Sequence, residues 1–268
     1  MTITLTAAAC RALGTADPAA KAEAAHAMAR AWRAGGMEIG DAAPPDRPAR
    51  PARPALRPPR EMPKRGRGMS MAGRIALLHA LAHIELNAID LACDLIARFT
   101  AEDLPRGFYD DWVTVADEEA THFRLLSARL EALGAAYGDL PAHDGLWEAA
   151  EATRADLPAR IAVVPLVLEA RGLDVTPPII ASLTRACDAE SAAVLERIYA
   201  DEVGHVAAGR RWFDWLCDRA GAEPAATWQS LVRKHFRGAL KPPFNTEARE
   251  RAGLPAAFYD ALTADKRS

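Results

Sequence analysis

Two helical segments of this sequence carry a glutamate and a histidine where the pattern requires core residues. In and around the segment YADEVGHVAAG, residues at steps of three and four are Leu195, Ile198, Glu202, His205, Gly209 and Trp212. Residues at these steps lie on one face of an α-helix. We therefore expect Glu202 and His205 to point in the same direction as the apolar residues around them.

The segment ADEEATHFRLL repeats this arrangement earlier in the chain. Its inward positions are Trp112, Val115, Glu119, His122, Leu126 and Leu130. Two other apolar stripes contain one acid each, Glu85 in LAHIELNAIDLACD and Glu169 in PLVLEARGLDVTP. The distance from each single acid to the glutamate of the Glu-x-x-His motif that follows it is nearly equal, at 34 (119 − 85) and 33 (202 − 169) residues. We infer one helical hairpin that is used twice.

Four carboxylates in one core need a compensating charge. Burying one unpaired charge costs several kcal/mol, on the order of what a whole domain has to spare. The acids could be protonated, pair with buried arginines or surround bound cations, and the inward stripes contain no Arg or Lys. Two divalent cations would balance four carboxylates. Oxygen-rich ligation with one histidine per metal suits iron or manganese better than structural zinc.

Any one of these features alone is weak. A single Glu-x-x-His on a helix is usually a surface pair, and a single inward acid is often a misread register. The order, the spacing and the inward placement of all six residues together favour a dinuclear metal site.

Strand-like alternation is absent, so we expect an all-α fold. Helix signals indicate helices over 70–99 and 106–133, a third from 157 that is kinked at Pro165 and stops at Gly172, and a short helix opened by Pro177. A long helix should follow from Asp188 or Glu190 to Gly221. We expect a four-helix bundle over 70–221. It would be flanked by N-terminal helices in 1–42, a proline/arginine-rich strap in 43–69 and C-terminal helices in 222–268, including one over 228–240.

The strap reads APPDRPARPARPALRPPREMPKRGRG over residues 43–68. Proline at this frequency excludes a helix or a central strand, so the segment should run extended, largely as polyproline II. It is either a stiff strap across the main domain or a basic arm that meets a phosphate-bearing partner. The formal net charge of −3 argues against an obligatory nucleic-acid partner.

Composition favours a reduced cytoplasmic protein. The four cysteines are far apart, without a Cys-x-x-Cys pair, which argues against disulfides and zinc knuckles. The N-terminal segment lacks the features of a signal peptide. No uncharged apolar run reaches the roughly 18 residues of a membrane span, because the longest candidate, Ile75–Ile96, is interrupted by charged residues.

The four quoted segments together resemble the ferritin-like di-iron carboxylate superfamily. More narrowly, they resemble a bacterial group of ferritin-like proteins known only as a domain of unknown function, over roughly residues 45–245. The resemblance implies two metal ions. Their ligands would be Glu85 and His122 for one metal, Glu169 and His205 for the other, and Glu119 and Glu202 between them.

The resemblance also implies residues that support the ligands. Asp201 and Glu118 precede the two motif glutamates, where an acid often orients a ligand histidine through its free ring N–H. His79 and His83 lie off the Glu85 stripe and are expected as core histidines or as supports of the site. Tyr199, one turn before Glu202, would line the pocket or simply pack.

The expected cofactor is two Fe ions, with Mn or mixed Mn/Fe as alternatives. The function implied is an O2-dependent non-haem di-iron oxidase or monooxygenase that acts on an unidentified small-molecule substrate, with a separate electron donor and no catalytic residue beyond the metal ligands. Alternatives are a ferroxidase or iron-handling protein, a tRNA-modifying hydroxylase and a metal-stabilised interaction module. We expect no membrane partner and consider a homodimer a fair expectation.

Overall fold

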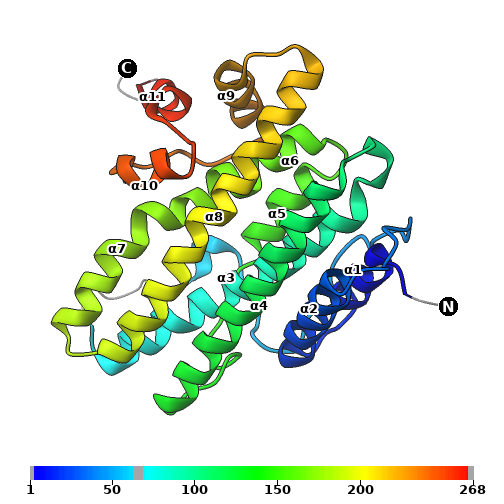
Figure 1. The fold of residues 1–268 in the computed structure, drawn as a ribbon. Coiled ribbons are helices and arrows are strands. Elements are labelled where there is room, and N and C mark those ends of the chain that lie inside the picture. Colours follow the sequence, from blue (N-terminus) through cyan, green and yellow to red (C-terminus); the bar gives the residue numbers. More distant parts are fainter. Residues whose placement is uncertain (1–2, 63–68, 265–268) are drawn as a thin grey trace. The chain divides into compact units, whose positions relative to one another are not determined.

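The structure is a computed structural model that describes residues 3–62 and 69–264 (Figure 1). Within these residues the regular structure is helical, apart from one isolated parallel bridge between Leu56 and Ala142. The all-α prediction is therefore confirmed. The chain divides into two compact units, Met1–Gly145 and Leu146–Ser268.

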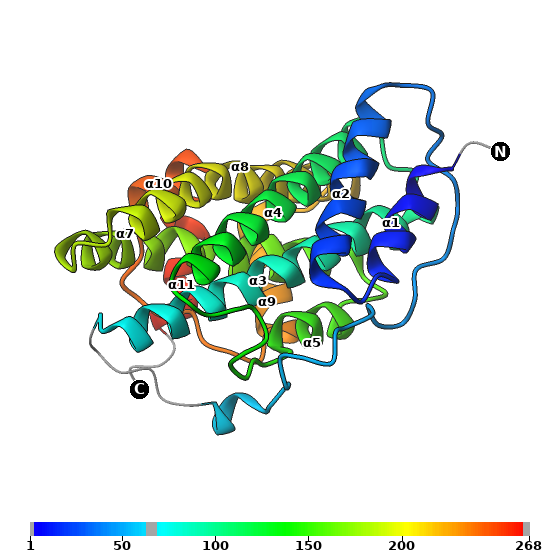
Figure 2. The ribbon, with the colours of Figure 1, turned by 90° about the horizontal axis from the view of Figure 1, so that it is seen from below.

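The first unit consists of two helix pairs and the strap (Figure 2). Its helices are α1 (Leu5–Leu13), α2 (Pro18–Arg33), α3 (Met71–Arg98) and α4 (Arg106–Ala132). Helix α3 packs along α4, while α2 packs on α4 and α1 on α3. The bounds of α3 and α4 agree with the prediction to within one residue, because local signals such as the Ser70 N-cap determine them.

The strap lies against these helices. Its described part contains only one short 3₁₀ turn, Pro59–Glu61. Backbone hydrogen bonds join Ala49 N–H to the Leu13 carbonyl and Arg57 N–H to the Ala142 carbonyl, both at 2.8 Å. The stretch KRGRG, residues 64–68, is the last part of the segment that the sequence offers as a basic arm, and it lies outside the described residues.

The second unit is built around the pair α7 and α8, which lie side by side in Figure 1. Its helices are α5 (Gly145–Ala152), α6 (Leu157–Val163), a π-helical segment (Val164–Glu169), α7 (Ala170–Arg185), α8 (Ala189–Ala220), α9 (Pro224–His235), α10 (Thr246–Arg251) and α11 (Ala256–Ala264). Helix α8 has the predicted ends, with Asp188 as N-cap and Gly221 in the left-handed conformation as C-cap. Helix α5 was not predicted.

The predicted stop at Gly172 and the separate helix at Pro177 are wrong. Helix α7 continues through Gly172, Pro177 and Pro178. Proline at 177 cannot donate a hydrogen bond to the carbonyl of Leu173, four residues earlier. The side-chain amide of Asn245 donates to that carbonyl instead, at 3.2 Å, which removes part of the cost of the proline.

Two further predictions need correction. The kink expected at Pro165 is a π-helical segment, in which the chain accommodates the proline by changing its hydrogen-bond spacing. The helix expected over 228–240 is α9, which begins and ends earlier. Its N-cap, Glu223, accepts hydrogen bonds from the backbone of Ala225 and Ala226, and the backbone turns extended at Phe236.

Helix α3 is long and apolar enough to cross a membrane by length and composition alone. Its 18-residue window has a mean hydropathy of 1.4, but 72% of that window is buried inside the protein. This is typical of a core helix in a soluble protein.

Candidate metal centre

The first unit brings three of the predicted ligands together. Glu85 on α3 and Glu119 and His122 on α4 each offer a ligand atom, and these atoms lie within 4.8 Å of one another. Nδ1 of His122 is 3.3 Å from a carboxylate oxygen of Glu85 and 3.4 Å from one of Glu119. The exposed fractions of the three residues are 5%, 1% and 0%. The cluster is therefore a buried, convergent donor set.

Helical periodicity accounts for this convergence. The predicted inward positions of α4 are all buried, and so is Glu85 on α3. Glu119 and His122 are one turn apart and so share a face. Since α3 packs along α4, Glu85 comes to lie beside them.

The electrostatics of this cluster favour positive charge. Burial, and next the neighbouring Glu119 carboxylate, raise the pKa of Glu85 well above its usual value. Burial alone lowers the pKa of His122, but hydrogen bonds to Glu119 and Glu85 outweigh it and raise the pKa to about 11. Glu85 and His122 thus hold on to protons, which a bound cation would displace.

The second unit contains the matching motif on α8. Glu202 and His205 are both buried, with 3.5 Å between a Glu202 carboxylate oxygen and Nδ1 of His205. The other predicted inward positions of α8 are buried as well. Glu169 is half-buried at the end of the π-helical segment, which packs on α8.

A close approach joins that segment to α8. A Cβ atom added to Gly209 would lie 2.6 Å from Cβ of Pro165. Only glycine at position 209 allows the two backbones to come this close. Gly209 therefore fixes the distance between the element that carries Glu169 and the one that carries His205.

A family model described as a protein of unknown function (DUF455) matches residues 14–260. This chain belongs to the DUF455 family. An uncharacterized protein of Haemophilus influenzae is 42% identical to it over 201 residues, which cover 73% of this chain and 69% of that protein. No solved structure matches the sequence. The DUF455 match spans both Glu-x-x-His motifs and brings no assigned activity.

Two of the residues expected to support the ligands, Asp201 and Tyr199, contact other side chains in this DUF455 chain. The Asp201 carboxylate accepts a hydrogen bond from Nε of Arg197 at 2.8 Å. The Tyr199 hydroxyl accepts one from the Asn245 side chain at 3.1 Å. Glu118 is half-buried beside Glu119 on α4. Their roles at a metal stay predictions.

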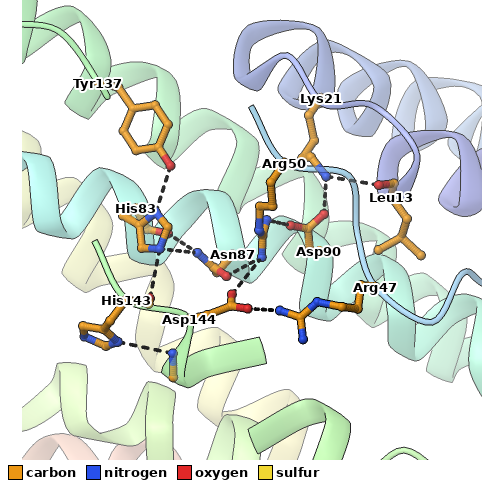
Figure 3. Close-up of polar contacts among 11 residues, drawn as sticks. Leu13, Lys21, Arg47, Arg50, His83, Asn87, Asp90, Tyr137, His143 and Asp144 are labelled. Carbon is orange, nitrogen blue, oxygen red and sulfur yellow. Dashed lines mark hydrogen bonds and ion pairs between the residues drawn. The ribbon is translucent and has the colours of Figure 1, made fainter. Parts of the chain in front are cut away.

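His83 lies on the face of α3 opposite Glu85, because two residues along a helix correspond to a rotation of about 200°. Figure 3 shows its partners. The ring Nε2 is 3.1 Å from the backbone carbonyl of His143, so Nε2 donates, and Nδ1 accepts a hydrogen bond from Tyr137 at 2.8 Å. Burial lowers the pKa of His83 to about 4, so the ring is neutral. The structure thus places His83 on α3 in contact with the loop that follows α4.

Sequence reasoning missed a second polar stripe on α3. Its members are His79, His83, Asn87, Asp90 and Asp94, at steps of four, four, three and four residues. All five are buried. The spacing of three and four residues is the sequence signal from which this polar stripe could have been predicted.

The donor set fits a divalent transition metal. Carboxylate oxygens with one imidazole per pair of acids suit iron or manganese, whereas structural zinc sites use mainly Cys and His. Among the described residues, no cysteine belongs to the group of potential metal ligands, and all four cysteines are free thiols. The residues present are therefore compatible with the expected metals.

Proposed function

We propose that this protein is an O2-dependent non-haem di-iron oxidase or monooxygenase with a ferritin-like four-helix bundle. The observation that carries the proposal is the buried convergence of Glu85, Glu119 and His122. The same residue types recur on α8, as Glu202 and His205. In this proposal both half-sites serve one dinuclear centre, and α3, α4, α7 with its π-helical segment, and α8 form the bundle.

Each ligand has a stated task. Glu85 and His122 would hold one ion, Glu169 and His205 the other, and Glu119 and Glu202 would bridge them. A bound pair of iron ions supplies the redox chemistry with O2. The protein residues hold the ions, compensate their charge and keep water out of the site through burial.

Metal content tests the ligand set. We expect about two irons per chain in iron-loaded protein, and a loss of most of this iron in Glu119→Ala and in His205→Ala. Glu131→Ala is the matched control, because Glu131 is an exposed acid on the same helix as Glu119. Elemental analysis of the purified variants gives the answer. Normal iron content in both ligand variants would show that the ligand set is wrong.

Oxygen uptake tests the reaction class. An oxidase or monooxygenase consumes O2 continuously only while a reductant is supplied. A ferroxidase consumes O2 in proportion to added Fe²⁺ and accumulates many irons per chain in a large shell. An O2 electrode and size-exclusion chromatography separate these outcomes. Iron-loaded protein that takes up no O2 with reductant would contradict the oxygenase proposal.

The tRNA alternative has less support. Arg47 and Arg50 of the strap pair with Asp144 and Asp90 of the same unit. These ion pairs offset the positive charge that the two arginines would offer to phosphate. Co-purification of tRNA in a salt-sensitive complex would reverse this ranking.

A further inference from the structure

Helix α3 is buried on two opposite faces, and the two faces differ in chemistry. One face carries Glu85 among Leu78, Ile89 and Ile96, and the other is the polar stripe defined above. Every residue of the polar stripe is at most 4% exposed. A buried helix with a continuous polar face needs a partner for each polar group.

The centre of the polar stripe is a compensated charge cluster (Figure 3). The Asp90 carboxylate accepts from Lys21 of α2 through one oxygen and from Arg50 of the strap through the other. Lys21 and Asp90 are both fully buried. Arg50 also donates to the Asn87 side chain at 2.5 Å. Two positively charged side chains, one from α2 and one from the strap, therefore bind the same carboxylate on α3.

The ends of the polar stripe are tied down as well. Nε2 of His79 accepts a hydrogen bond from the backbone N–H of Gly138 at 2.9 Å, in the loop after α4. Asp94 accepts from Arg98, and Arg98 donates in turn to the carbonyl of Pro45 in the strap at 3.0 Å. The polar stripe thus meets the strap, α2 and the loop along its whole length.

The sequence of the strap is matched to this task. Residues 47–55 repeat the triplet Arg-Pro-Ala three times. A polyproline II chain has three residues per turn, so successive arginines recur on one side. Arg47 pairs with Asp144, and Arg50 pairs with Asp90 and lies 3.8 Å from Asp144. The first two arginines of the repeat therefore meet internal acids.

These contacts determine how α3 is rotated. The rest of the helix is largely Leu, Ala and Ile, and apolar contacts have little directional preference. Turning α3 by one residue would move Asp90 away from both cations and leave a buried charge unpaired, which is strongly disfavoured. The same rotation would turn Glu85 away from His122.

We propose that Lys21, Arg50 and Asp90 are positioning residues that fix the rotation and axial position of α3, and thereby aim Glu85 at Glu119 and His122. This inference rests on the proposed metal-binding role of those three residues. It assigns the proline/arginine strap and the N-terminal helices a part in building the site.

The decisive variant replaces the charge cluster with apolar residues of similar size, as Lys21→Met, Arg50→Met and Asp90→Leu together. Replacing a buried ion cluster in this way is often neutral or stabilising, so we expect an unchanged or higher Tm. We expect the affinity for Co²⁺ to fall roughly tenfold or more, with altered visible absorption bands. Wild-type affinity and bands in a folded triple variant would overturn the proposal.

A second readout does not depend on metal. In metal-free, ¹⁵N-labelled protein we expect one set of amide resonances for residues 85–90 in the wild type. The triple variant should show doubled or broadened resonances there, because α3 then has more than one rotation. One sharp set in the triple variant would contradict the proposal, even if the wild type failed to bind Co²⁺ and the proposed function were wrong.

Two controls complete the design. The exposed pair Glu23 and Arg30 on α2 is 2.7 Å apart, and Glu23→Gln with Arg30→Met should change neither readout. If the triple variant fails to fold, the double variant Lys21→Met with Asp90→Asn takes its place. It removes one positive and one negative charge and keeps the shape of the cluster. Wild-type Co²⁺ binding and a single set of resonances in that variant would equally overturn the proposal.

Discussion

At the scale of single residues, burial decides the chemistry of this protein. Glu85, Glu119 and His122 are acids and a base in a place that otherwise holds Leu and Val. Their convergence raises the pKa of Glu85 through burial and through the charge of Glu119. The surroundings of His79 act in the same way, because burial lowers the pKa of its ring.

His79 should make stability fall in mild acid. Burial lowers its pKa, and Nε2 accepts the Gly138 N–H, which a protonated Nε2 cannot do. The unfolded chain protonates this histidine near its ordinary pKa of about 6.5, and the folded chain does so only at lower pH. The contribution of His79 to stability is therefore complete above the unfolded-state pKa of about 6.5 and is lost as the pH falls toward the folded-state pKa. Urea unfolding at pH 7.5 and 5.5 should show a smaller difference in His79→Gln than in the wild type.

Gly209 and Gly204, both on α8, should respond in opposite directions to alanine. A Cβ at 209 would overlap Pro165, so Gly209→Ala should lower the free energy of unfolding by about 1–3 kcal/mol. A Cβ at 204 meets nothing within 4 Å, so Gly204→Ala should raise it by roughly 0.5–1 kcal/mol. Denaturant unfolding compares the two. Equal effects would mean that the contact between α8 and the π-helical segment is absent.

At the scale of elements, helix ends and interruptions depend on partners from elsewhere in the chain. Helix α7 passes through Pro177 because Asn245 donates to the carbonyl that the proline leaves unpaired. Asn245 also caps α10 by accepting from the backbone of Ala248 at 3.2 Å. One side chain therefore stabilises two helices.

This double role makes Asn245→Ala costly, by about 1.5–3 kcal/mol of unfolding free energy, from the lost cap and the unpaired carbonyl together. In a Pro177→Ala background the backbone N–H of residue 177 can serve the Leu173 carbonyl. The cost of Asn245→Ala should then shrink by about 1 kcal/mol. A double-mutant cycle by denaturant unfolding measures the coupling, and a value near zero would assign the continuity of α7 to other contacts.

At the scale of the whole molecule, the proposed metal binding would be linked to folding. A metal that binds the folded chain raises its stability by mass action, by about 2.7 kcal/mol at a free concentration 100 times Kd. A bound metal would also relieve the crowding of Glu85 and Glu119. Stripping the metal with a chelator should lower Tm in the wild type and leave Glu119→Ala almost unchanged. Calorimetry with and without chelator tests this, and equal shifts in both proteins would place the metal elsewhere.

Short-range patterns in the sequence predict three of the long helices and their inward faces. Capping residues such as Ser70 and Asp188 and the spacing of three and four act over a few residues, so α3, α4 and α8 could be predicted almost to their ends. For the same reason the burial of Glu119, His122, Glu202 and His205 followed from periodicity.

The pairing of groups that are distant in the sequence follows from the tertiary structure alone. Arg50 and Asp90 are 40 residues apart in sequence, and Asn245 and Leu173 are 72 apart. The position of the basic strap and the continuity of α7 through two prolines depend on such pairs. The free-energy cost of a buried charge or of a proline in a helix depends on the groups around it, which come from distant parts of the sequence. Local patterns carry no record of those surroundings, so the partners of the polar stripe on α3 and the course of α7 became visible only in the folded chain.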